Sequence, residues 1–169
     1  MRTSLLFISL CVVFLCTCCG TRIDQNNQDM IETSDLESQA LTAMTDFYGF
    51  LNHKQYQRAA KLYGGSYDIL IDYNPTVEEG DKSSLLRAAC RFNGFMCLEV
   101  LSAQLIEGDD QGEFTYEVKF ANPDGSEFVL GPCCGASEEE MPPKSSFTVY
   151  VQCDDDGSCL VMDLPPYLP

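Results

Sequence analysis

The spacing of the apolar residues changes near residue 95, and this change constrains the fold more than any other feature of the chain. From Thr33 to Leu51, apolar residues recur every three or four positions, which places them on one face of a helix. Shorter helical patterns cover residues 55–63, 66–73 (helical or extended) and 83–92. From Leu98 onwards the period is two, as in a strand. Helices followed by successive strands predict an α+β domain.

The second half of the chain contains four or five strand patterns. They cover residues 98–106, 114–120, 127–130, 147–152 and 159–164. The first has apolar residues in both alternating sets, so we expect it to be buried on both faces, whereas 114–120 is expected to be half exposed. Asn122-Pro123-Asp124-Gly125 has the residue order of a type I turn. The patterns predict N-terminal helices packed on an antiparallel sheet.

The N-terminus has the layout of an export signal in residues 1–17. Arg2 is the short basic region, residues 5–15 are apolar, and small residues and cysteines follow at once. A membrane-spanning helix needs about 20 apolar residues. The shorter run here favours a cleaved signal over a permanent anchor. The polar residues 18–37 are predicted to form a flexible tether, and residues 38–169 a single domain.

The end of this signal, Leu15-Cys16-Thr17-Cys18, resembles the lipobox of bacterial lipoproteins, in which a leucine precedes two small residues and a lipidated cysteine. The resemblance implies lipid attachment at Cys18, with Cys19 as the alternative acceptor. Several acyl chains on one cysteine give stable anchoring. We therefore expect an extracytoplasmic protein that is held at the cell membrane by lipid. The alternative is a secreted protein whose signal is cut near Gly20.

The charge of the chain restricts its partners. Ten Lys and Arg residues stand against 26 Asp and Glu residues, a formal net charge of −16. Such a chain is not expected to bind nucleic acid, and an anionic membrane surface would repel it. The expected partners are the membrane, through the lipid anchor, and an envelope protein or a small ligand.

The order of elements resembles the nuclear-transport-factor-2-like superfamily. The likeness rests on Asp46-Phe47-Tyr48 in the first helix, on Lys61-Leu62-Tyr63 and Ile69-Leu70-Ile71-Asp72, and on the strands that follow. It covers residues 38–164 and implies a curved sheet of four to five strands wrapped around the helices as a cone. The mouth of such a cone often holds a ligand or catalytic residues. A cystatin-like fold is the alternative.

Aromatic residues of the predicted helices are candidates for lining a cone mouth. The candidate pocket residues are Phe47, Tyr48, Tyr63, Tyr67, Asp72 and Tyr73. The same helical spacing is also typical of a packed core. His53, the only histidine, is predicted to lie exposed in a turn, and no serine-hydrolase motif accompanies it. We expect a non-catalytic binding or structural module without a cofactor. The alternative is a small-molecule binder or enzyme with an open pocket.

Six cysteines follow the signal and would meet oxidants after export: Cys90, Cys97, Cys133, Cys134, Cys153 and Cys159. The spacing favours a Cys90–Cys97 bridge at a helix–strand corner and a Cys153–Cys159 bridge across a hairpin tip. The adjacent pair Cys133 and Cys134 stays unassigned, as a vicinal disulfide or exchanged with the hairpin pair. A redox or zinc site is the competing interpretation, but no C-x-x-C motif is present. The acidic run at Asp154 lacks the spacing of an EF-hand loop, so no metal site is predicted.

Overall fold

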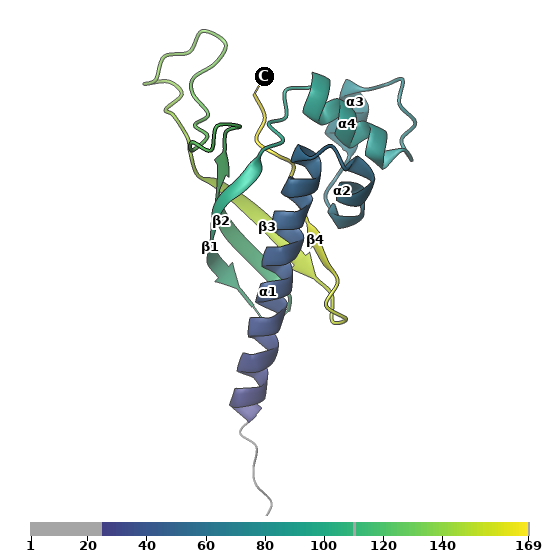
Figure 1. Cartoon of the computed structure of the whole chain (residues 1–169), viewed down its shortest axis with the longest axis vertical. Coiled ribbons are helices and arrows are strands. Elements are labelled where there is room, and N and C mark those ends of the chain that lie inside the picture. Colours follow the sequence, from purple (N-terminus) through teal and green to yellow (C-terminus); the bar gives the residue numbers. More distant parts are fainter. Residues whose placement is uncertain (1–24, 110, 169) are drawn as a thin grey trace, which may run out of the picture.

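The computed structural model describes residues 25–109 and 111–168, with side chains from Asp35 onwards (Figure 1). Four helices precede four strands. The elements are α1 (Gln25–Asn52), α2 (Tyr56–Leu62), α3 (Asp68–Tyr73), α4 (Lys82–Phe92), β1 (Glu99–Gly108), β2 (Glu113–Ala121), β3 (Phe147–Cys153) and β4 (Cys159–Val161). The strands form one antiparallel sheet in the order β1-β2-β3-β4. This is the α+β order that the change in apolar spacing predicts.

Helix α1 begins at Gln25, eight residues before the predicted start at Thr33. Residues 25–37, which the polar composition predicted to be part of a flexible tether, are therefore helical. Once the apolar face further along has nucleated a helix, each added residue gains one hydrogen bond for fixing only its own backbone, whereas nucleation fixes several residues for one bond. The signal and tether residues 1–24 lie outside the described residues, and the domain boundaries stay a prediction.

The core lies between α1 and one face of the sheet. The largest side chains that α1 buries there are Met44, Phe47, Tyr48 and Leu51. The ring of Tyr48 meets that of Phe120 on β2 edge to face, with centroids 5.0 Å apart. The hydroxyl of Tyr116 donates to the carbonyl of Glu37 over 3.1 Å. Apolar packing and this hydrogen bond together fix α1 across the sheet.

The three short helices pack at the C-terminal end of α1 (Figure 1). The Cys90–Cys97 disulfide, with Cα atoms 5.5 Å apart, joins the last turn of α4 to the segment that enters β1. After α2, Tyr63 makes a parallel bridge with Val161, and the N–H of Gly64 donates to the Val161 carbonyl over 3.0 Å. The short helices are therefore connected to both edge strands of the sheet, to β1 by the disulfide and to β4 by the bridge at Tyr63.

Strand β1 differs from its prediction, because most of its side chains are exposed rather than buried on both faces. It is one of the two edge strands, and its pairing with β2 is shifted at Leu101 and Ile106. These two side chains are 45% and 59% exposed. A bulge displaces an apolar residue from the core face and also hinders edge-to-edge association.

The sheet has four strands and is not strongly curled. Residues 127–130, predicted as a further strand, make only isolated bridges, Ala121 with Glu127 and Leu130 with Lys144. Proline and glycine in the following loop interrupt continuous pairing.

Candidate functional site on the open face of the sheet

The face of the sheet opposite α1 is not covered by a helix (Figure 1). Side chains alternate along a strand, so residues between the core positions of β2 and β3 point away from α1. We call this surface the open face. On β2 and β3 it includes Glu113, Thr115, Glu117, Lys119, Thr148, Tyr150 and Gln152.

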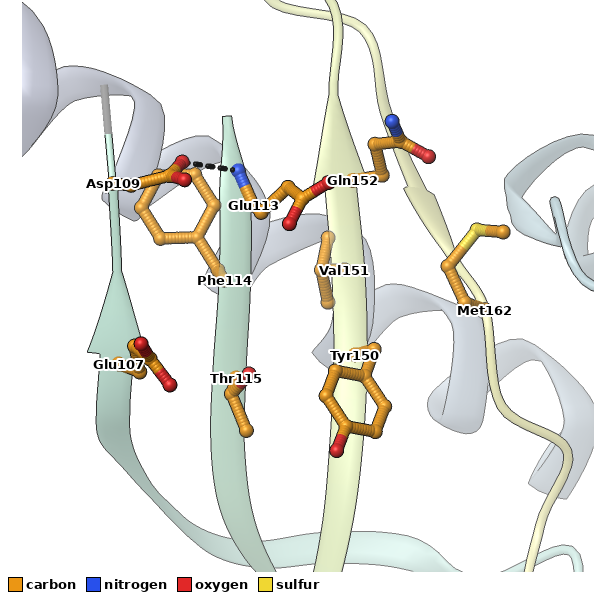
Figure 2. Close-up of a pocket in the computed structure, with 9 residues that line it drawn as sticks. All are labelled: Glu107, Asp109, Glu113, Phe114, Thr115, Tyr150, Val151, Gln152 and Met162. Atoms are coloured by element: carbon orange, nitrogen blue, oxygen red, sulfur yellow. Dashed lines mark hydrogen bonds between the residues drawn. The ribbon is translucent and has the colours of Figure 1, made fainter. Parts of the chain in front are cut away.

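A pocket of about 320 Å³ lies on the open face near the β1–β2 turn (Figure 2). The strand register places Glu107 opposite Thr115, and Thr115 opposite Tyr150. Met162 follows β4, and its N–H donates to the Tyr150 carbonyl over 2.9 Å. These four residues form a row across the sheet, as Figure 2 shows. The pocket is completed by Asp109, Glu113, Phe114, Val151 and Gln152.

Three carboxylates border this pocket. That of Asp109 closes the turn, because it accepts hydrogen bonds from the N–H groups of Gln111 (3.0 Å) and Glu113 (2.9 Å). Glu107 and Glu113 are exposed. Tyr150, 53% exposed, adds an aromatic ring and a hydroxyl. The pocket therefore offers hydrogen-bond acceptors beside an aromatic surface, which suits the binding of a polar or cationic group.

Asp163 is a half-buried carboxylate that the sequence interpretation missed. Burial raises the pKa of Asp163, whereas a hydrogen bond from the Tyr150 N–H to its Oδ2 (2.7 Å) acts in the opposite direction. A pocket of about 160 Å³ lies beside it, with Tyr48 and Lys144 in its walls. The available signal was a lone acid within the apolar segment 160–164.

The six predicted pocket residues do not come together around one cavity. Phe47, Tyr48, Tyr63 and Tyr67 are buried in the core. Successive ring centroids of this cluster lie 5.0–5.6 Å apart, as expected for packed aromatic side chains. Asp72 and Tyr73 are exposed on α3. Tyr48 also borders a pocket, the small one beside Asp163.

The structure contains the two disulfides that the spacing favours, Cys90–Cys97 and Cys153–Cys159. These bridges indicate an oxidising, extracytoplasmic compartment. Cys133 and Cys134 are thiols whose sulfur atoms lie 2.7 Å apart, with Cys134 at φ 61°. The proposed lipid-attachment residues, Cys18 and Cys19, lie outside the described residues.

His53 is exposed, as predicted. Its Nδ1 lies 2.8 Å from the carbonyl of Gly49, and its Nε2 lies 3.4 Å from a carboxylate oxygen of Glu99. Within residues 25–109 and 111–168, no three His, Cys, Asp or Glu side chains gather as metal ligands would. In the same part of the chain, no helix is long and apolar enough to span a membrane.

The chain matches no family model, no curated protein and no solved structure.

Proposed function

We propose that the protein is an exported, lipid-anchored envelope protein whose domain is a non-catalytic module that binds another envelope protein. The observation that carries this proposal is the open face, which holds a pocket between Glu107 and Met162 while the space between α1 and the sheet is filled by side chains. The exposed Tyr150 lines this pocket on the open face. Tyrosine and methionine are enriched in protein interfaces, and tyrosine supplies contact area there at low entropic cost.

The location of the module is supported by two kinds of observation. The disulfides are those of an oxidising compartment. The lipobox-like sequence before Cys18 supports attachment by lipid, with Cys19 as the alternative acceptor. The net charge of −16 supports lipid rather than electrostatic attraction as the means of holding the protein at a membrane.

The nuclear-transport-factor-2-like resemblance remains part of the proposal. Helices followed by an antiparallel sheet packed against α1 support it. The weakly curled sheet and the packed aromatic cluster supply no open cone mouth. A relationship to that superfamily would therefore be one of topology, with binding moved to the open face.

The alternative function, a small-molecule binder or enzyme, is favoured by one observation, the pocket beside Asp163. This pocket combines a half-buried carboxylate with Lys144 and the hydroxyl-bearing Tyr48. Its volume of about 160 Å³ is smaller than the roughly 300–1,000 Å³ of typical small-molecule sites. The open face is therefore the better-supported site.

Position-specific photo-crosslinking in intact cells tests the proposal. A benzophenone amino acid replaces Tyr150 on the open face in one variant and Tyr73 on α3 in the matched variant; both tyrosines are exposed. We expect a discrete crosslinked species from position 150 alone, which Glu107→Lys weakens because it reverses a charge at the pocket. Equal crosslinking at both positions, or none at position 150, would contradict the proposal.

A further inference from the structure

The basic residues of this acidic chain are concentrated at its helical end. Six of the ten Lys and Arg residues lie between His53 and Phe92, together with five acids. Residues 93–169 carry two lysines against fifteen acids. The helical end is thus the part of the described chain in which an anion meets the least repulsion.

Three of these bases line one pocket of about 380 Å³ between the end of α1 and helices α2 and α4. They are Lys54, Arg58 and Arg87, and the hydroxyl-bearing Ser83 and Ser84 line the same pocket. This volume lies within the range of small-molecule sites. We call it the basic pocket.

The arginines of the basic pocket are held in place by neutral partners. The guanidinium of Arg58 lies 3.8 Å from the centroid of the Phe50 ring, and its Nη1 donates to Oε1 of Gln55 over 2.8 Å. The Nη2 of Arg87 lies 3.4 Å from Oγ of Ser84. A stacked, hydrogen-bonded guanidinium keeps further N–H donors and its full charge for a ligand.

Lys54 occupies a backbone position where glycine is the usual residue. Its φ is 62°, in the left-handed region. Its N–H donates to Leu51 (3.1 Å) and that of Gln55 donates to Phe50 (2.7 Å), which together form the Schellman motif that ends α1. A lysine at this position costs conformational energy that glycine would not.

Among the side chains described, none of these three bases forms an ion pair within 4.0 Å; the two ion pairs found are His53–Glu99 and Lys119–Glu127. One acid, Asp81, interacts with the basic pocket. Its Oδ1 accepts hydrogen bonds from Oγ of Ser83 and the N–H of Ser84, both 3.0 Å long, while its charge interacts with Arg87. Asp81 thus caps α4 and leaves most of the positive charge uncompensated.

We propose that the basic pocket binds the phosphate group of a soluble, phosphorylated small molecule. Two guanidinium groups, an ammonium group and the Ser84 hydroxyl provide more donors than one carboxylate accepts, whereas a phosphate accepts through several oxygens. The pocket lies at the end of α1 opposite Gln25 (Figure 1), and a helix of 28 residues is about 42 Å long. A lipid headgroup is therefore the less suitable source of the phosphate. The preference for a soluble source rests on the proposed lipid anchor at the N-terminus, whereas the binding of phosphate itself does not depend on the proposed function.

Calorimetric titration of the full mature chain in detergent with sodium pyrophosphate tests this site, with sodium chloride of equal ionic strength as the reference. We expect saturable binding to the unsubstituted chain and a Kd raised about tenfold by Arg87→Gln, which corresponds to the loss of one charged contact. Lys54→Gly is expected to weaken binding similarly while leaving the unfolding midpoint equal or higher, because glycine favours the left-handed conformation. The matched control is Lys61→Gln, which removes a charge from α2 outside the pocket and should leave the Kd unchanged.

Absence of saturable binding by the unsubstituted chain would overturn the proposal. An equal loss in Lys61→Gln would also overturn it, because the effect would then follow net charge alone. In a parallel experiment, phosphatidylglycerol vesicles are mixed with unlipidated chain. Binding to vesicles without binding to pyrophosphate would replace the soluble ligand by a lipid headgroup.

Discussion

At the scale of single residues, two neighbouring tyrosines differ in how their buried hydroxyls are satisfied. The rings of Tyr63 and Tyr67 meet edge to face, 5.0 Å apart. The hydroxyl of Tyr63 donates to the carbonyl of Ser66 over 2.9 Å. That of Tyr67 is buried without a hydrogen-bond partner among the described residues, and burial raises the pKa of Tyr67 to about 12. A buried, unpaired hydroxyl is destabilising.

The two tyrosines therefore predict opposite effects of the same substitution. Tyr63→Phe should lower the free energy of unfolding by about 0.5–1.5 kcal/mol, because one hydrogen bond is lost. Tyr67→Phe should leave it unchanged or raise it by up to about 1 kcal/mol, because an unpaired hydroxyl is removed. Urea unfolding followed by circular dichroism measures both. A loss in Tyr67→Phe as large as that in Tyr63→Phe would show that this hydroxyl has a partner.

Asp163 predicts a pH dependence with a definite sign. Because burial raises its pKa in the folded state, the folded protein favours the protonated carboxyl, and stability falls as pH rises through its titration. Asp163→Asn keeps an oxygen that can accept from the Tyr150 N–H. It should therefore raise the free energy of unfolding at pH 7, and this gain should disappear near pH 3, where the carboxyl is protonated in both states.

The matched control for this prediction is Asp156→Asn. Hydrogen bonds from Ser158 lower the pKa of Asp156, so its charged form stabilises the fold above its titration range and this contribution is lost as pH falls. Asp156→Asn should therefore be destabilising at pH 7. Equal signs for the two variants in urea unfolding would contradict the assignment of Asp163 as a desolvated carboxyl.

At the scale of elements, β4 is the strand that depends most on bonds other than sheet pairing. It has only three residues, and Cys153–Cys159 links it to β3 with Cα atoms 3.9 Å apart. We expect Cys153→Ala/Cys159→Ala to lower the free energy of unfolding by about 2–3 kcal/mol. Hydrogen exchange should show that the amides of β4 lose protection first.

The other disulfide supplies the control for this effect. Cys90→Ala/Cys97→Ala opens a loop of similar length, seven rather than six residues apart, at the far end of the sheet from β4. It should lower global stability by a similar amount without selective exposure of β4. Selective exposure of β4 in both variants would show that its protection does not come from the Cys153–Cys159 bridge.

The success of sequence interpretation also differs from element to element. The order of helices and strands was predictable, because each period reports a local preference for one face. The exposure of β1 was not predictable from the sequence. Its apolar residues Leu101 and Ile106 lie in bulges, and the position of a bulge depends on the pairing with β2. The helical start at Gln25 was missed because its polar residues carry no apolar period and extend a helix nucleated further along.

The candidate sites were less predictable than the fold for a related reason. Phe47, Tyr63 and Tyr67 have the spacing of either a core or a pocket wall, and only their mutual packing decides between the two. The open face was missed because Glu107, Thr115 and Tyr150 are brought into one row by strand register, which no local pattern contains.

At the scale of the whole molecule, the proposed function requires the domain to present its uncovered sheet face outside the cytoplasm from a lipid anchor. Its charge is unevenly distributed, because six bases and five acids lie between residues 53 and 92, whereas residues 93–169 carry two lysines against fifteen acids. Binding at the open face and at the basic pocket would use different ends of the fold. The proposed binding at the open face depends on export, and the proposed presentation at the membrane depends on lipid attachment.

The most direct test of this central claim is the intact mass of the protein extracted from membranes, compared between the unsubstituted chain and Cys18→Ala. The account predicts a chain that begins at Cys18 and carries acyl groups, and a Cys18→Ala chain that lacks them and leaves the membrane fraction. Acyl groups on Cys19 would show that Cys19 rather than Cys18 is the attachment residue and would leave the claim of lipid anchoring intact. An unacylated chain cut near Gly20 and recovered from the medium would contradict the claim.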